Sequence, residues 1–187
     1  MRLFVDPKRA AIDLVAQNGI GAEIGVHLGE FSSLILSVAK PRKLHLIDPW
    51  KYVPDPTYQW SLYGGEHVTQ HDMDARHALV LSKFAREIAA GTVEVHRQRS
   101  TSAASHLNDD ELDFVYIDGD HTYDAVSQDL KAFFPKLKQG GLIIGDDYHL
   151  RGWWKDGVVR AFNEFLAASN ALVEFKLAGQ IVVRKLS

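Results

Sequence analysis

Residues 22–32 read AEIGVHLGEFS, a short apolar strand that passes through two glycines into a helix. Glu23 stands where the strand approaches the carboxyl edge of a sheet. Gly25 and Gly29 allow backbone amides to come close to a ligand that a Cβ atom would keep away. This strand, glycine turn and helix predict a nucleotide-binding loop, with a tight structural turn as the alternative explanation.

A second apolar strand, residues 43–47, ends in Asp48, nineteen residues after Gly29. A dinucleotide-binding fold places a carboxylate at about this spacing, where it contacts ribose hydroxyls. The phosphate-binding pattern G-x-G-x-x-G is absent. Glu23 suits a cationic or amine-bearing ligand, whereas a pyrophosphate prefers a bare helix N-terminus. The two carboxylates therefore predict one shared ligand other than NAD.

The composition excludes several classes of protein. With 187 residues, 46% of them apolar, and a mean hydropathy of −0.14, the chain is predicted to form a single domain over residues 1–187 with a buried core. It lacks an apolar run of the roughly 20 residues that span a bilayer, and a secretory signal is not expected. The absence of cysteine excludes disulfides, and a net charge of −3 gives no footprint for nucleic acid. We expect a cytoplasmic protein that binds neither nucleic acid nor membrane.

Helical and strand patterns alternate along the chain, which predicts an α/β fold. The expected architecture is a Rossmann-like, doubly wound seven-stranded sheet, mostly parallel, with a C-terminal antiparallel hairpin whose short turn contains Gly179. Helices are predicted over residues 6–18, 29–39, 69–90, 122–138 and 156–168. Strands are predicted over residues 21–26, 43–48, 92–96, 112–118, 140–146, 171–177 and 179–185.

Two further strands end in aspartates, in FVYIDGDHTY at residues 114–123 and in GGLIIGDDY at residues 140–148. If the strands are neighbours, as a right-handed crossover favours, then Asp118, Asp146 and Asp147 lie close together. Three carboxylates cannot all stay ionised without compensation, so either a pKa rises or a cation binds. An all-oxygen set of ligands favours Mg²⁺, with Mn²⁺ or Ca²⁺ as substitutes. The alternative is that these aspartates cap turns.

These segments resemble a known family. E-x-G-x-x-x-G, followed by LIDPW at residues 46–50, resembles the first two motifs of class I methyltransferases that depend on S-adenosyl-L-methionine (SAM), whose sheet also ends in an antiparallel hairpin. IDGDHTY and GGLIIGDDY resemble the bacterial I-D-G-D-H-x-Y and G-G-x-x-x-x-D-D-Y group of metal-dependent O-methyltransferases. The resemblance implies that SAM is held by Glu23, Gly25, Gly29, Ser32, Asp48, Pro49, Trp50, Ser100 and Asp118.

The same resemblance implies a metal site and a catalytic base. A divalent cation, Mg²⁺ by preference, would lie on Asp118, Asp146 and Asp147, although the catechol-type enzymes carry Asn in place of the last of these. That difference favours a sugar or polyol as the small-molecule acceptor over a catechol. His121 stands where the sugar-modifying branch carries a histidine, and its near-neutral pKa suits removal of a hydroxyl proton. Alternatively, His121 caps the helix that begins near Thr122.

The loop at about residues 50–70 is rich in Trp and Tyr and is predicted to be a lid or substrate loop. Its rings could stack on a ligand or pack onto the core. Together with the N-terminal helix it could also form a homodimer interface. A metal-independent methyltransferase and a cofactor-binding module without catalysis remain alternative functions.

Overall fold

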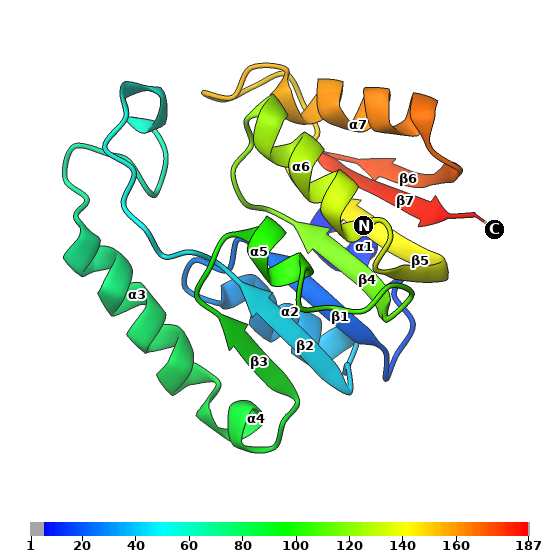
Figure 1. The fold of residues 1–187 in the computed structure, drawn as a ribbon, viewed down its shortest axis with the longest axis horizontal. Coiled ribbons are helices and arrows are strands. Elements are labelled where there is room, and N and C mark those ends of the chain that lie inside the picture. The colour runs from blue at the N-terminus through cyan, green and yellow to red at the C-terminus, as the bar shows by residue number, and fades with distance from the viewer. Residues whose placement is uncertain (1–5, 187) are drawn as a thin grey trace, which may run out of the picture.

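The computed structural model describes residues 6–186, so the domain predicted over residues 1–187 extends beyond the described residues at both ends. Seven strands form one sheet in the order β3-β2-β1-β4-β5-β7-β6 (Figure 1). The predicted fold class is confirmed, including the antiparallel hairpin at the C-terminal end. Five strands are parallel: β1 (Ile20–Ile24), β2 (Lys43–Ile47), β3 (Val93–His96), β4 (Leu112–Ile117) and β5 (Leu137–Gly145). Strand β7 (Gln180–Lys185) lies between β5 and β6 (Ala171–Leu177) and runs antiparallel to both.

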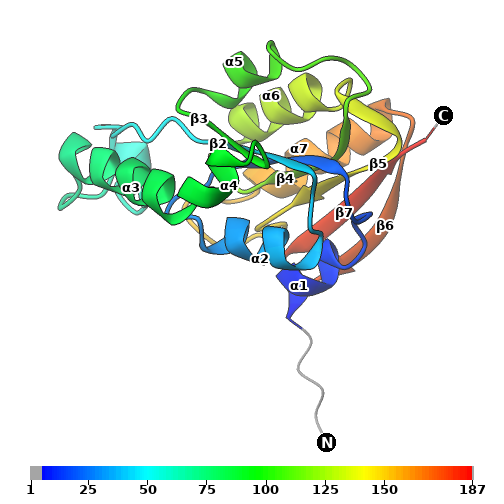
Figure 2. The ribbon, with the colours of Figure 1, turned by 90° about the horizontal axis from the view of Figure 1, so that it is seen from below.

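Helices cover both faces of the sheet (Figures 1 and 2). One face carries α5 (Ser100–Ala104), α6 (Tyr123–Phe133) and α7 (Gly157–Ala168). The other face carries α1 (Pro7–Ile12) and α2 (Glu30–Val38), and α3 (Gln70–Lys83) and α4 (Ala85–Ala89) share its apolar core. Because strand side chains alternate, Val115 and Ile117 of β4 pack into the first core while Phe114 and Tyr116 pack into the second.

The turn between β6 and β7 has the geometry that a two-residue hairpin requires. Ala178 and Gly179 both adopt positive φ, 44° and 89°. Such a turn matches the twist of the strands it joins, so the short connection indeed fixes an antiparallel pair. Its position beside the end of β5 places Gln180, the first residue of β7, at the carboxyl edge of the sheet.

Several predicted boundaries are wrong. The helix predicted at 69–90 is broken at Phe84, which ends α3 and precedes α4 and whose ring packs against Gly29. The helix predicted at 122–138 ends at Phe133, because Pro135 cannot donate the amide hydrogen bond that would continue it. The first helix ends at Ile12 rather than at residue 18, and α5 was not predicted. Within residues 6–186, every helix is too short or too polar to cross a membrane.

Candidate active site

A cavity of about 1090 Å³ lies at the carboxyl ends of the parallel strands. Its walls come from the loops after β1, β2, β4 and β5, from the start of α1 and α5, and from the aromatic loop after β2. The structure brings together most of the site residues predicted from the sequence: Glu23, Gly25, Asp48, Pro49, Ser100, Asp118, His121, Asp146 and Asp147 line the cavity. Gly29, Ser32 and Trp50 lie behind its wall.

The two glycines of the first loop are required by packing inside the protein. Gly25 and Gly29 have φ of 88° and 72°, which L side chains rarely adopt. A Cβ atom on Gly25 would lie 2.0 Å from the carbonyl oxygen of Asp118, and one on Gly29 would lie 2.6 Å from the ring of Phe84. Packing thus accounts for both glycines, since Gly25 joins the β1 loop to the β4 loop and Gly29 seats Phe84, and their expected approach to a ligand stays a prediction.

Glu23 offers a carboxylate that the protein leaves available. Its side chain is 1% exposed, and its Oε2 atom has no hydrogen-bond partner among residues 6–186. Burial raises the pKa of Glu23 to about 8. A buried polar atom without a partner at the wall of a cavity fits a ligand that donates hydrogen bonds or carries positive charge. The hydroxyl of Ser32 lies beside this carboxyl, and its contact lowers the pKa of Glu23 and offsets part of the effect of burial.

Asp48 is held by a set of internal hydrogen bonds. Its Oδ2 accepts from the amides of Val26 at 3.0 Å and His27 at 3.1 Å, and from the hydroxyl of Tyr63 at 2.5 Å. Its Oδ1 accepts from the amide of Trp50 at 2.7 Å. Tyr63 comes from the aromatic loop, so this loop supplies one of the four hydrogen bonds that hold Asp48.

Trp50 is part of the core. It is fully buried with φ of 39°, its Nε1 donates to the carbonyl of His27 at 3.0 Å, and its ring lies 4.8 Å from that of His77. Trp50 therefore fixes the start of the aromatic loop in the core, whereas its neighbours Pro49 and Lys51 line the cavity.

Ser100 brings a partner that the sequence did not reveal. Its hydroxyl donates a hydrogen bond to Asp129 of α6, and both residues line the cavity. Asp129 is buried, and burial raises its pKa to about 7. The cavity thus has a further buried acid, on α6 and far along the chain from the first loop.

Lys8 lies between the carboxylates of Asp118 and Asp146. Its Nζ is 3.0 Å from Asp118 Oδ2 and forms an ion pair with Asp146 Oδ2. Although burial opposes the charge, the two carboxylates raise the pKa of Lys8 above its ordinary value. Burial raises the pKa of Asp118. Burial also opposes ionisation of Asp146, but the Lys8 ammonium and the hydrogen bonds to this carboxyl together lower the pKa of Asp146.

Asp146 is also tied to the last strand. Its Oδ1 accepts from the side chain of Gln180 and from the amide of Asp147, and the carbonyl of the Gln180 side chain accepts from Tyr116 at 3.1 Å. A chain of polar contacts therefore runs from Tyr116 through Gln180 and Asp146 to Lys8. It joins β4, β7, the loop after β5 and α1.

The three aspartates, as they are arranged, do not fit a divalent cation. The ammonium of Lys8 satisfies two of them, and Asp147 instead faces His149, whose Nε2 is 3.2 Å from its Oδ1. Within residues 6–186 the trio is not among the groups whose ligand atoms all lie within 4.8 Å of one another. The sequence predicted either a raised pKa or a bound cation, and the structure shows a raised pKa at Asp118 together with a cationic side chain, Lys8, between two of the acids.

His121 faces the same acids from the opposite side. Its Nε2 is 3.5 Å from Asp118 Oδ1 and 3.7 Å from Asp147 Oδ2, and its ring lies 4.8 Å from that of Trp154. Burial opposes its charged form, but the carboxylates of Asp118, Asp147 and Asp146 raise the pKa of His121 above its ordinary value.

The capping role considered for His121 falls to Thr122. The Thr122 side chain accepts from the amide of Ala125 and its own amide donates to Asp120. His121 Nε2 is buried and faces the carboxylates of Asp118 and Asp147, while the residue itself lines the cavity.

The aromatic loop covers part of the cavity. It holds only a short 3-10 turn, η1 (Pro56–Tyr58). The hydroxyl of Tyr58 donates to Asp120 at 2.6 Å, and its ring lies 5.2 Å from that of Trp153. Trp153 in turn lies 5.9 Å from Trp154, so rings from two distant loops meet over the acids.

Sequence reasoning missed Lys8, Asp129 and Gln180. Asp6 and Pro7 mark a helix start, because the Asp6 side chain accepts from the amides of Lys8 and Arg9. That pattern predicts α1 but says nothing of where the lysine side chain points. Asp129 and Gln180 stand on a helix and a strand without a motif around them, so only the fold brings them to the cavity.

Comparisons with known proteins agree with this geometry. A family model described as a methyltransferase domain matches residues 22–148, more than half of the chain. A 56-residue stretch is 36% identical to "uncharacterized protein R132" of Acanthamoeba polyphaga mimivirus, and it covers 30% of this chain and 25% of that protein. The chain thus matches only a quarter of the length of this relative.

Two solved structures share the fold. A Streptococcus mutans protein in complex with S-adenosylhomocysteine (SAH) has a TM-score of 0.65 and 11% identity, over 98% of this chain and all of that one. A SAM-dependent O-methyltransferase from Thermotoga maritima has a TM-score of 0.60 and 12% identity, over 100% of this chain and 68% of that one. At such identities the likeness establishes the architecture alone.

Proposed function

The chain belongs to the methyltransferase domain family, and we propose that it transfers a methyl group from SAM to a hydroxyl of a small molecule. One observation carries the proposal. His121 of the β4 loop and Glu23 of β1 line the same cavity, and each has a buried side-chain atom, Nε2 and Oε2, without a hydrogen-bond partner among residues 6–186. A base and a site for a cationic cofactor therefore meet in one place.

The cofactor is proposed to lie along the β1 and β2 side of the cavity, by Glu23, Gly25, Asp48 and Pro49. Burial raises the pKa of Glu23 to about 8, so the free protein holds a proton there at pH 7, and the positive charge of bound SAM would favour the ionised carboxylate. Ser100 and its partner acid on α6 provide hydrogen-bonding groups on another wall. The Streptococcus mutans structure supports this assignment, since it carries SAH within the same fold. When bound, SAM supplies a methyl group whose bond to sulfur breaks as the acceptor oxygen bonds to the carbon.

His121 is proposed to remove the hydroxyl proton of the acceptor. Its neutral Nε2 accepts that proton, and the imidazolium that forms is stabilised by Asp118 and Asp147 at 3.5 and 3.7 Å. Since the neutral form is the base, the raised pKa of His121 means that turnover should increase with pH through that pKa. The loop aromatics Tyr58, Trp153 and Trp154 can stack on a sugar or another ring, which favours a hydroxylated small-molecule acceptor.

Magnesium dependence is the alternative that the sequence motifs favour. For Mg²⁺ to bind Asp118 and Asp146, the ammonium of Lys8 would have to withdraw, because it occupies the space between them. We propose instead that Lys8 provides the positive charge of this edge.

A homodimer also remains a prediction, for which the aromatic loop and α1 are the candidate surfaces.

Calorimetric titration with SAH, followed by an acceptor screen that measures SAH release from SAM, tests the proposal. We expect His121→Ala to keep SAH affinity and to lose about 10²- to 10⁴-fold in turnover, the range that general-base catalysis contributes. His149→Ala is the matched control, because this histidine also contacts Asp147 but does not line the cavity. Near-normal turnover of His121→Ala would contradict the assignment.

Two further results separate the alternatives. EDTA should leave turnover unchanged if Lys8 supplies the charge, whereas loss of activity with recovery in Mg²⁺ would establish the metal-dependent form. SAH binding without methylation of any hydroxyl, amine or carboxyl acceptor would instead indicate a cofactor-binding module.

A further inference from the structure

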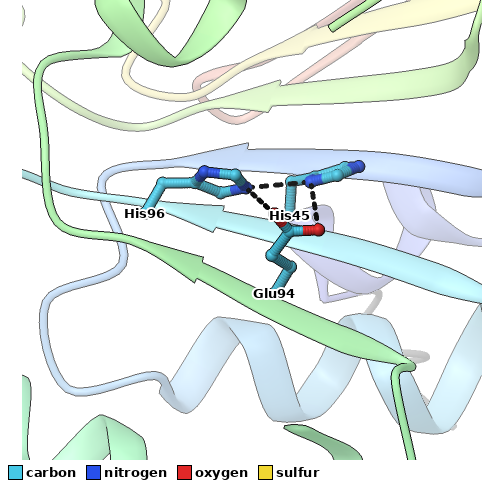
Figure 3. Close-up of side chains that lie close together, drawn as sticks. All are labelled: His45, Glu94 and His96. Carbon is cyan, nitrogen blue, oxygen red and sulfur yellow. Dashed lines mark hydrogen bonds and ion pairs between the residues drawn. The ribbon is translucent and has the colours of Figure 1, made fainter. Parts of the chain in front are cut away.

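A second group of ligand-type side chains lies away from the cavity, at the open edge of the sheet. His45 belongs to β2, and Glu94 and His96 belong to β3, the edge strand; we call these three residues the β2/β3 cluster. His45 and Glu94 are directly opposite in the parallel register, and Glu94 and His96 are two residues apart. All three therefore point to one face of the sheet, as Figure 3 shows.

The ligand atoms of the cluster converge. His45 Nδ1 is 2.9 Å from His96 Nε2. Glu94 Oε2 is 3.9 Å from His45 Nδ1, and Glu94 Oε1 is 3.7 Å from His96 Nε2. Zinc binds nitrogen at about 2.0 to 2.1 Å, so tetrahedral ligand atoms lie about 3.3 Å apart. The observed separations lie on both sides of that value, and small side-chain movements would equalise them. Among residues 6–186 this is the group of three or more whose ligand atoms lie within 4.8 Å of one another.

The chemistry of the cluster favours a borderline metal. Two imidazoles and one carboxylate are typical ligands of Zn²⁺ and suit Mg²⁺ and Ca²⁺ poorly. Burial lowers the pKa of His45 to about 4, and burial likewise lowers the pKa of His96. Both rings are therefore neutral at pH 7, the form in which imidazole binds a metal. His45 is 3% exposed, and a metal on its Nδ1 would replace the hydrogen bond between that atom and His96 Nε2 and leave the proton on the buried Nε2.

Lys43 is the group that competes with a metal for the cluster. Its Nζ lies 2.6 Å from Glu94 Oε2. The other oxygen, Oε1, faces His96, so the carboxylate can keep its ion pair through one oxygen and bind a metal through the other. Without a metal, a hydrogen bond between the two imidazoles explains their close approach.

We propose that His45, Glu94 and His96 bind one Zn²⁺ ion, or a divalent metal of similar preference, which joins the edge strand β3 to β2. The ion would leave a fourth coordination position open on the exposed side, where Glu94 lies. The consequence for the active site is indirect. The carbonyl of His96 accepts from the amide of Asp48 at 3.1 Å, so a metal here would fix the strand that carries Asp48. This proposal does not depend on the proposed methyl transfer.

Zinc titration of the metal-free protein against a chromophoric chelator tests the site. We expect one Zn²⁺ per chain, a higher unfolding temperature with Zn²⁺, and no comparable effect of Mg²⁺. Loss of an outer contact typically weakens metal binding by roughly 10- to 100-fold, so loss of a ligand in His96→Gln or Glu94→Gln should weaken it at least as much. Lys43→Gln should bind zinc as tightly as the wild type or more tightly, because it removes the competing ion pair.

Two control variants exclude other zinc sites. His71→Gln removes an exposed histidine from α3, and Asp147→Asn removes a carboxylate from the cavity; both should bind zinc like the wild type. Glu94 is the most exposed member of the cluster, so Glu94→Gln keeps the test valid even if His96→Gln folds poorly. Absence of 1:1 zinc binding in the wild type, or unchanged affinity in Glu94→Gln and His96→Gln, would overturn the proposal.

Discussion

The two ends of the cavity hold their buried carboxylates in different ways. At the β1/β2 end, Asp48 accepts four hydrogen bonds from groups within 22 residues of it in the sequence. At the β4/β5 end, Asp118 and Asp146 share one ammonium, from a lysine 110 residues before Asp118, and Asp146 also accepts from the side chain of Gln180 and the amide of Asp147. The first carboxylate organises its own loops, whereas the charge of the second pair is balanced by a side chain that can be removed without breaking a backbone contact. The two ends should therefore respond differently to substitution.

Asp48→Ala should have the largest effect on stability. It leaves three amides and one hydroxyl without their acceptor, and each unsatisfied buried donor costs about 1–3 kcal/mol. Because the loops can partly relax towards water, we expect a loss of about 3–5 kcal/mol, measured by urea unfolding followed by circular dichroism. Asp48→Asn keeps the shape and the oxygen and should lose less. A loss below about 1 kcal/mol in Asp48→Ala would mean that the loops fold without this acceptor.

Glu23→Gln should have the next largest effect, which is a change in how the free energy of unfolding depends on pH. Burial raises the pKa of Glu23 from 4.5 to about 8, so between these values the unfolded chain is ionised while the native chain holds the proton. Native protein then binds more protons, and wild-type stability should fall as pH rises, by roughly 3–4 kcal/mol over this window for this group. The difference in unfolding free energy between Glu23→Gln and the wild type isolates it. If the unfolding free energies of Glu23→Gln and the wild type change in parallel with pH, Glu23 ionises with its ordinary pKa.

Lys8→Met should destabilise the β4/β5 end by about 1–3 kcal/mol, less than a fully buried pair, because the lysine side chain is 38% exposed. The lowered pKa of Asp146 contributes stability above the ordinary pKa near 4 that is lost as pH falls through the native value. The difference in unfolding free energy between the wild type and Lys8→Met should therefore be largest at pH 7 and decrease as the pH falls.

Lys8→Arg, which keeps the charge, is the control for this substitution. Calorimetry should also show weaker Mg²⁺ binding to the wild type than to Lys8→Met, since the variant exposes the two carboxylates. Equal stability of Lys8→Met and the wild type at pH 7 would remove the contrast between the two ends.

Tyr63→Phe should have the smallest effect. It removes one of the four bonds to Asp48 and leaves the three amides in place, which costs about 1 kcal/mol in urea unfolding. If a ribose hydroxyl replaces the tyrosine on this carboxylate, SAH affinity should be kept or increased, as calorimetry would show. A strong loss of SAH affinity would instead place the phenol in contact with the ligand.

Local patterns predicted most of the fold and nine of the residues that line the cavity. The strands, the hairpin turn at Ala178 and Gly179, and the acids at strand ends follow from short stretches of sequence, and the structure places them as expected. Phe84 breaks a helix because its ring is needed under Gly29, a tertiary contact that helical periodicity does not encode. Lys8 was missed for the same reason, since its contact with Asp118 spans most of the chain.

The contacts that Lys8 and Gln180 make with Asp146 have a consequence for how related domains could differ at this edge. The stretch that matches the methyltransferase family is residues 22–148, and the two side chains that contact Asp146, Lys8 and Gln180, lie outside it, one on each side. The acids thus lie within the matched stretch, while the ammonium that balances their charge comes from a flanking segment. Exchanging only the first helix and the last hairpin between relatives could therefore convert an edge neutralised by an ammonium into one that requires a metal ion, without changing any residue of the shared motifs.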